Sequence, residues 1–144
     1  MDQLDVEPGA RSTDPPCVVL CDLDGVVWLA HQPIPGSVEA IAALRAAGHR
    51  VLFVTNNSAA RVESQEQSLG AIGIPAVGDV LTSANAAALL IEAGQRVLVC
   101  GGEGVVQAVV GRGAVVVDGE DAGGDVGVVG FHRSFDYDEM LLTS

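Results

Sequence analysis

The chain of 144 residues carries 19 acidic and 7 basic residues, which gives a formal net charge of -12 at pH 7, and lysine is absent. Such an acidic chain, without a basic cluster, excludes nucleic acids and anionic membranes as expected partners. No apolar run approaches the roughly 20 residues of a membrane-spanning helix, and the N-terminus has no signal-peptide pattern. The sequence therefore predicts a cytoplasmic protein.

Apolar runs and glycine stops alternate along the chain. Residues 1–16 are polar and predict a disordered tail. Strands are predicted at 17–25, 50–58, 79–83, 96–102, 114–119 and 126–135, and helices at 38–47, 59–73, 84–94, 103–113 and from 136 onward. Ser37 is the expected N-cap of the first helix. This alternation is typical of parallel β-α-β units, so we predict an α/β fold with a Rossmann-like parallel sheet.

Two carboxylates, Asp22 and Asp24, end the first apolar run, and Gly25 follows at once. Ligands of open parallel sheets bind beyond the carboxyl ends of the strands. We therefore expect this pair to share one edge with the polar residues that end the second strand: Thr55, Asn56 and Asn57.

The chemistry of this edge points to phosphate. Two nearby carboxylates repel each other and favour a hard cation, for which Mg²⁺ is the natural candidate. An aspartate can act as a nucleophile, and a second carboxylate can act as a general acid and base. Gly25 permits a sharp turn that brings amides near a phosphate, and Thr55 offers a hydroxyl. Asn56 and Asn57 also fit a turn and a helix cap.

These residues lie in segments that resemble the haloacid dehalogenase superfamily, and more narrowly its p-nitrophenylphosphatase subfamily. The segments are "DLDGVVW", "PIPGSVEAIAALRAAGHRVLFVTNNS", "VLTSANAAALL", "VLVCGGEGV" and "VGVVGFHRSFDYDEM". The resemblance implies a core in residues 17–94 and the first part of an inserted α/β cap in residues 95–144.

The resemblance also implies roles for individual residues. Asp22 would be the nucleophile and Asp24 the general acid and base. The Asp22 carboxylate and the Asp24 carbonyl would hold Mg²⁺. Thr55 would bind the phosphoryl group, with Asn56 and Asn57 beside it. The expected activity is hydrolysis of a small phosphorylated metabolite, such as glycerol 3-phosphate or phosphoglycolate, through an aspartyl-phosphate.

The chain departs from the family pattern in one respect. The family uses a lysine and a later acidic motif, and neither is present. We therefore expect an N-terminal part of a longer enzyme, with a sheet edge left uncovered and little activity alone, and a dimer when full length. The alternatives are a degenerate, non-catalytic fragment and a phosphoacceptor domain.

Other residues have structural interpretations. Cys17, Cys21 and Cys100 are expected to be buried free thiols. His31 is expected in an exposed loop, and residues 101–104 in a tight strand-to-helix turn. His132 and Arg133 are expected in a solvated loop. The acids Asp118, Glu120, Asp121 and Asp125 are expected in a flexible loop that is not a calcium site.

Overall fold

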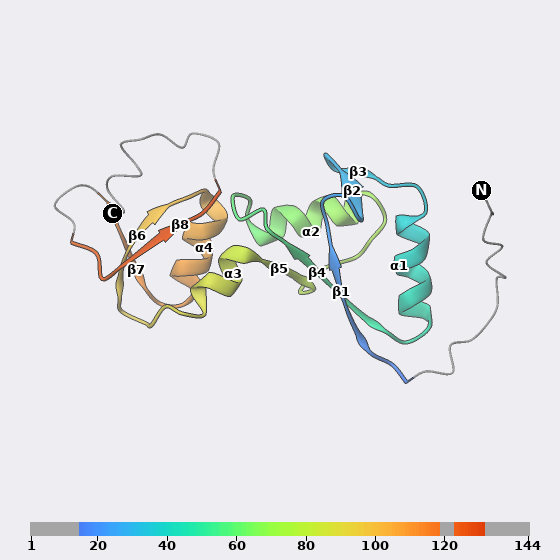
Figure 1. The fold of residues 1–144 in the computed structure, drawn as a ribbon, viewed down its shortest axis with the longest axis horizontal. Helices are drawn as coiled ribbons and strands as arrows, with labels where there is room; N and C mark the ends of the chain where they lie inside the picture. The colour runs from blue at the N-terminus through green and yellow to red at the C-terminus, as the bar shows by residue number, and fades with distance from the viewer. Residues whose placement is uncertain (1–14, 119–122, 132–144) are drawn as a thin grey trace.

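The computed structural model describes residues 15–118 and 123–131. Several predictions fall outside the described residues. They concern the tail at residues 1–14, the acids Glu120 and Asp121, the loop residues His132 and Arg133, and the helix from residue 136. Within them the chain forms two α/β units side by side, each with its own sheet (Figure 1). None of the helices in these ranges is long and apolar enough to cross a membrane.

The first unit contains a parallel three-stranded sheet in the order β1-β4-β5. Its strands are β1 (Val18–Asp22), β4 (Arg50–Thr55) and β5 (Val80–Thr82). Helix α1 (Ser37–Ala46) packs on β4, and helix α2 (Val62–Ala71) packs on β5. The predicted parallel α/β fold is confirmed.

The second unit repeats the pattern with a sheet in the order β7-β6-β8, all parallel. Its strands are β6 (Arg96–Cys100), β7 (Val115–Val117) and β8 (Val126–Val129). Helix α4 (Glu103–Gly111) packs on β6 and β7, and the short helix α3 (Ser83–Ala88) packs against α4. Residues 101–102 make the predicted tight turn between β6 and α4.

A two-stranded antiparallel hairpin, absent from the prediction, follows the first strand. It joins β2 (Trp28–Leu29) to β3 (Gln32–Pro33) through Ala30 and His31, which have φ angles of 47° and 62°. Residues other than glycine seldom adopt these angles, and the sequence has no Asn-Gly signal here, so the turn was not predicted.

Three local predictions are wrong. Gly36, and not Ser37, is the N-cap of α1, because the Ser37 hydroxyl donates to the carbonyl of Val27 at 2.9 Å. Helix α3 ends at Ala88, short of the predicted residue 94. Of the three free cysteines only Cys100 is buried, since Cys17 is exposed and Cys21 is half-buried.

The burial of β1 explains the error on the cysteines. A continuously apolar strand predicts burial on both faces, but β1 alternates between exposed and half-buried residues. Val18 and Leu20 are 59% and 65% exposed, whereas Val19 and Cys21 pack against the hydrophobic core of the first unit. In the part of the chain that the structure describes, β1 is an edge strand.

Candidate active site

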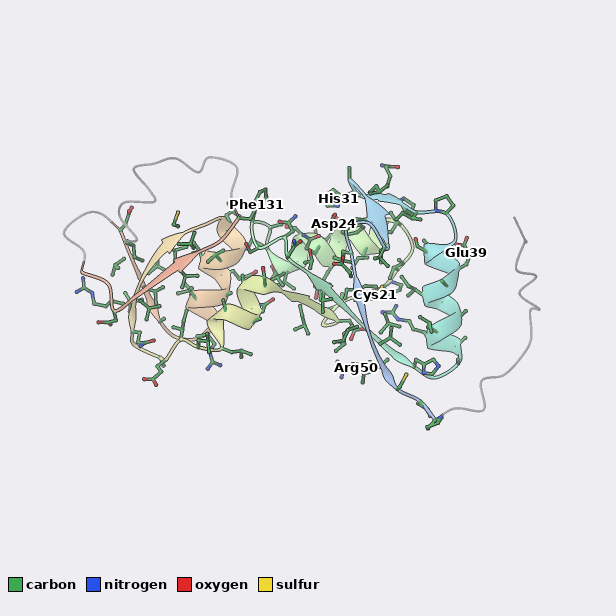
Figure 2. The ribbon with its side chains drawn as sticks, viewed as in Figure 1. Cys21, Asp24, His31, Glu39, Arg50 and Phe131 are labelled. Atoms are coloured by element: carbon green, nitrogen blue, oxygen red, sulfur yellow. The ribbon has the colours of Figure 1, made fainter. Side chains whose placement is uncertain are left out.

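The pairing of β1 with β4 brings the two predicted polar groups to one edge of the sheet. Asp22 lies opposite Val54, so Thr55 is one register position beyond it on the neighbouring strand. Adjacent strands lie about 4.8 Å apart, so the backbones of the two residues are neighbours at this edge of the sheet. Figure 2 shows Asp24 at this end of β1, whereas Arg50 marks the opposite end of the sheet.

The two aspartates flank a buried leucine. Asp22 ends β1 and is exposed, Leu23 is fully buried, and Asp24 is exposed again. The Leu23 carbonyl accepts the backbone N–H groups of Val27 and Trp28 at 2.9 and 3.1 Å, which closes the turn after the strand. The chain therefore presents both carboxylates to solvent while it anchors itself through the residue between them.

Gly25 makes the sharp turn that the sequence predicted. Its φ of 87° belongs to the left-handed region that favours glycine. Its own N–H, however, donates to the carbonyl of Trp28 at 2.8 Å. Gly25 therefore shapes the loop, and its own amide is already bonded within it.

Trp28 holds the second aspartate in place. The indole Nε1 donates to Asp24 Oδ1 at 3.0 Å, and only 1% of the Trp28 side chain is exposed. The centroid of the Trp28 ring also lies 4.9 Å from the centroid of the exposed His31 imidazole. A buried aromatic residue thus links the Asp24 carboxylate to the tip of the hairpin.

The loop after β4 is held by its own side chains. Thr55 is buried, and its Oγ1 accepts the backbone N–H of Asn57 at 3.1 Å. A hydroxyl that accepts still has its own hydrogen to donate. Asn57 Oδ1 accepts the N–H of Ala59 at 3.2 Å, and the Asn56 carbonyl accepts from the Ser83 hydroxyl at 3.2 Å. The turn interpretation of the asparagines is confirmed, but the helix-cap interpretation is wrong, because α2 begins at Val62 and its N-cap is Arg61. The Thr55 hydroxyl remains able to donate to a ligand.

The thiol beside the nucleophile candidate is not a competing nucleophile. Burial, and to a smaller degree the charge of Asp22, raises the pKa of the Cys21 thiol. A thiol with a raised pKa stays protonated at neutral pH, and only the thiolate is strongly nucleophilic. Cys21 is therefore a poor nucleophile at this edge.

The donor atoms at the edge suit a hard cation with several water ligands. The bridge between Asp24 and Trp28 uses the Leu23 carbonyl and the Gly25 amide, so the Asp24 carbonyl takes no part in it. The Asp22 carboxylate and this carbonyl are oxygen ligands of the kind that Mg²⁺ accepts while keeping water. Among the described residues, no group of three or more His, Cys, Asp or Glu side chains could hold a metal.

The second unit contacts the first at the loop that follows β4. The Phe131 N–H donates to the Ser58 hydroxyl at 2.9 Å, and the Gly104 N–H donates to the Ala59 carbonyl at 3.1 Å. A Cβ added to Gly104 would overlap the Ala60 and Ser58 carbonyl oxygens, so only glycine fits. Sequence reasoning missed these contacts, because nothing in the glycine cluster indicates what lies against it.

Gln107 adds a side-chain link between the units. Its Oε1 accepts the N–H of Val62 at 3.1 Å, and its Nε2 donates to both oxygens of Glu63 at 2.7 Å. The pKa of the Glu63 carboxyl is lowered, and the hydrogen bonds from Gln107 Nε2 are the main cause. Gln107 therefore supplies a partner for the first turn of α2, whose own N-cap residue makes no side-chain hydrogen bond.

Comparison with known proteins places this arrangement in a family. A family model described as haloacid dehalogenase-like hydrolase matches residues 19–114. The chain is 38% identical to a D-glycerol 3-phosphate phosphatase of Mycobacterium tuberculosis over 66% of this chain and 28% of that protein. It is 34% identical to an acid sugar phosphatase of Staphylococcus saprophyticus over 84% of this chain and 48% of that protein.

Solved structures give the same result. A glycerol phosphate phosphatase from M. tuberculosis in complex with magnesium superimposes with a TM-score of 0.77 and 32% identity, over 87% of this chain and 39% of that chain. A p-nitrophenyl phosphatase from Archaeoglobus fulgidus gives a TM-score of 0.79 at 27% identity, over 90% of this chain and 50% of that chain.

The chain spans between about a quarter and a half of the length of the curated relatives named above. The matched region nevertheless includes both sides of the candidate site, the end of β1 and the end of β4. The chain belongs to the haloacid dehalogenase-like hydrolases.

Proposed function

We propose that the protein is a magnesium-dependent phosphatase of small phosphomonoesters, in which Asp22 is the nucleophile. The observation that carries the proposal is the register of β1 and β4, which sets Asp22 beside Thr55 at one sheet edge in a chain of this family. The relatives named above as D-glycerol 3-phosphate phosphatase and acid sugar phosphatase support glycerol 3-phosphate as the first substrate to test. Phosphoglycolate is the second, since a further relative is a phosphoglycolate phosphatase.

In the proposed reaction an Asp22 carboxylate oxygen attacks phosphorus, and the bond between phosphorus and the ester oxygen breaks. Asp24 gives its proton to the departing oxygen, so the alcohol leaves neutral. Asp24 then takes a proton from water, whose oxygen attacks the phosphorus of the aspartyl-phosphate and frees Asp22 and phosphate. The indole of Trp28 orients the Asp24 carboxylate for both proton transfers.

Two further groups support the phosphoryl oxygens in this scheme. The Thr55 hydroxyl donates to one of them while its oxygen accepts from Asn57. The Asp22 carboxylate and the Asp24 carbonyl would hold Mg²⁺, which when bound would neutralise charge on the phosphoryl group. The remaining cation that the family uses, a lysine, is absent from the 144 residues. We therefore propose that residues 17–94 form the first part of the core and that residues from 95 form the first part of a cap. The 144-residue chain alone should have little activity.

The test is Asp22→Asn in the full gene product, assayed for phosphate release from glycerol 3-phosphate with and without Mg²⁺. Release should fall by several orders of magnitude, while the thermal unfolding midpoint is retained because Asp22 is exposed. Asp118→Asn, an exposed acid in the second unit, is the matched control and should change neither quantity. Unchanged release by Asp22→Asn would reject the nucleophile. No magnesium-dependent release by the wild-type protein would favour a degenerate, non-catalytic member.

A further inference from the structure

An exposed thiol and a histidine lie side by side at the end of the first sheet that is away from the candidate active site. Cys17 comes directly before β1 and is exposed, and His49 comes directly before β4 and is half-buried. Figure 2 labels Arg50, the first residue of β4, at this end of the sheet. Asp22 ends β1, about 16 Å further along the strand, so the pair is separate from the carboxylates.

The hydrogen bonds of His49 determine which ring nitrogen can take a proton. The backbone N–H of Cys17 donates to His49 Nδ1 at 3.2 Å. A backbone N–H can only donate, so Nδ1 is an acceptor and the neutral ring carries its proton on Nε2. Cys17 Sγ lies 3.3 Å from the same nitrogen, so the thiol can act only as a donor to it. The two side chains thus have the arrangement of a nucleophile beside its base.

The backbone holds the two residues in this position. The Cys17 carbonyl accepts the N–H of Arg50 at 3.0 Å, and the N–H of His49 donates to the carbonyl of Leu44 in α1 at 3.1 Å. Gly48, with a φ of 90°, makes the turn between α1 and His49. The pairing of β1 with β4 therefore sets the thiol next to the imidazole.

The other two cysteines of the chain lack this combination of access and base. Cys100 is buried, and Cys21 is half-buried with a thiol whose pKa is raised by burial. Exchange between a thiol and a disulfide requires an accessible sulfur that can give up its proton. Of the three thiols, Cys17 is the exposed one, and its proton has an acceptor within reach.

We propose that Cys17 is a modification site that forms mixed disulfides with low-molecular-weight disulfides, and that His49 is its base. In the reaction the Sγ proton passes to His49 Nδ1, and Sγ attacks one sulfur of the reagent. The disulfide bond of the reagent breaks, and the leaving thiolate takes the proton from Nδ1 and departs as a thiol. Cys17 is oxidised and one half of the reagent is reduced, so no other oxidant takes part. The inference does not rest on the proposed function.

The first test compares the folded and unfolded protein and needs no variant. The full gene product is incubated with oxidised glutathione at neutral pH, and the modification of each cysteine is followed by digestion and fragment mass spectrometry. Cys17 should react about tenfold faster in the folded protein than in urea, because only folding sets the base beside it. A rate in the folded protein equal to or below the rate in urea would overturn the proposal, as would faster reaction at Cys21 or Cys100.

The second test separates the base from the hydrogen bond. In His49→Asn the amide oxygen can still accept the backbone N–H of Cys17, but it cannot take the thiol proton. The reaction of Cys17 should slow about tenfold in the folded protein and stay unchanged in urea. An unchanged rate in the folded variant would overturn the assignment of His49.

His31→Asn, the same change at an exposed histidine of the hairpin, is the matched control and should leave the rate at Cys17 unchanged. The thermal unfolding midpoint shows whether His49→Asn is folded at the assay temperature. If it is not, the comparison of the folded and unfolded wild-type protein decides alone.

Discussion

The two units of the molecule have the same parallel α/β pattern but are filled by different side chains. The first core is built on large residues, with Trp28, Phe53 and Leu69 fully buried. The second is built on valines and alanines, with Ile91 as its largest member. The first unit also carries the carboxylates and Thr55, whereas the second contacts it through glycines, backbone groups and the Gln107 side chain. The unit with the larger core side chains thus holds the candidate site residues.

Replacement of a large core residue tests this difference most strongly. Phe53→Ala should lower the free energy of unfolding by about 3–5 kcal/mol, because it leaves a large cavity between β4 and its neighbours. It also removes the contact between Phe53 and the Arg45 guanidinium, which lies 5.6 Å from the ring centroid. Val97→Ala, an equally buried position in the second core, removes fewer carbon atoms and should cost about 1.5–3 kcal/mol.

Urea unfolding followed by the fluorescence of Trp28, the single tryptophan, and by circular dichroism measures both variants. Equal losses of stability in the two variants would contradict the contrast between the cores.

The contact between the units gives the next largest effect. Gly104→Ala should destabilise the chain by about 1–3 kcal/mol, since the new methyl group would overlap backbone atoms of residues 58 and 60. Gly111→Ala in the same helix has open space around it and should be stabilising by about 0.5–1 kcal/mol. Thermal unfolding of the pair separates close packing from helix propensity, and a neutral Gly104→Ala would show that the units do not meet here.

The smallest expected effect concerns the link between Gln107 and Glu63. The hydrogen bonds from Gln107 lower the pKa of Glu63, so they favour its ionised form in the folded chain. The resulting stabilisation is present above the ordinary pKa of a glutamate and is lost as the pH falls through the lowered folded-state value.

Gln107→Met should therefore move the Glu63 pKa back towards the ordinary value, as measured by NMR titration of its side chain. The salt bridge of Arg61 to Glu63, at 4.0 Å, is left in place as an internal control. A Glu63 pKa that does not move in Gln107→Met would assign the shift to the other groups around it.

The contrast between the units also marks what the sequence could predict. Strand and helix order, and the position of Asp22 and Thr55 at one sheet edge, follow from local patterns: apolar runs, glycine stops and polar residues at strand ends. The alternating burial of β1 could not be read from its apolar run, because residue type does not reveal which face a helix covers. The hairpin was missed because Ala30 and His31 adopt left-handed angles that they rarely take.

Side-chain features between elements distant in sequence were beyond local reasoning. The links of Gln107 to α2 and of Gly104 to the loop after β4 join residues about 45 positions apart. The contact of Cys17 with His49 left no local signal either, since the two residues are 32 positions apart and only the pairing of β1 with β4 brings them together.

The most direct measurement is the location of the phosphoryl group during turnover. The full gene product is mixed with glycerol 3-phosphate labelled in its phosphoryl group, quenched in acid, digested and mapped by mass spectrometry. The label should lie on the peptide that contains Asp22 and should be absent from Asp22→Asn. Phosphate release with the label on another residue would contradict the assignment of this sheet edge as the catalytic centre. Phosphate release that is unchanged in Asp22→Asn would contradict it as well.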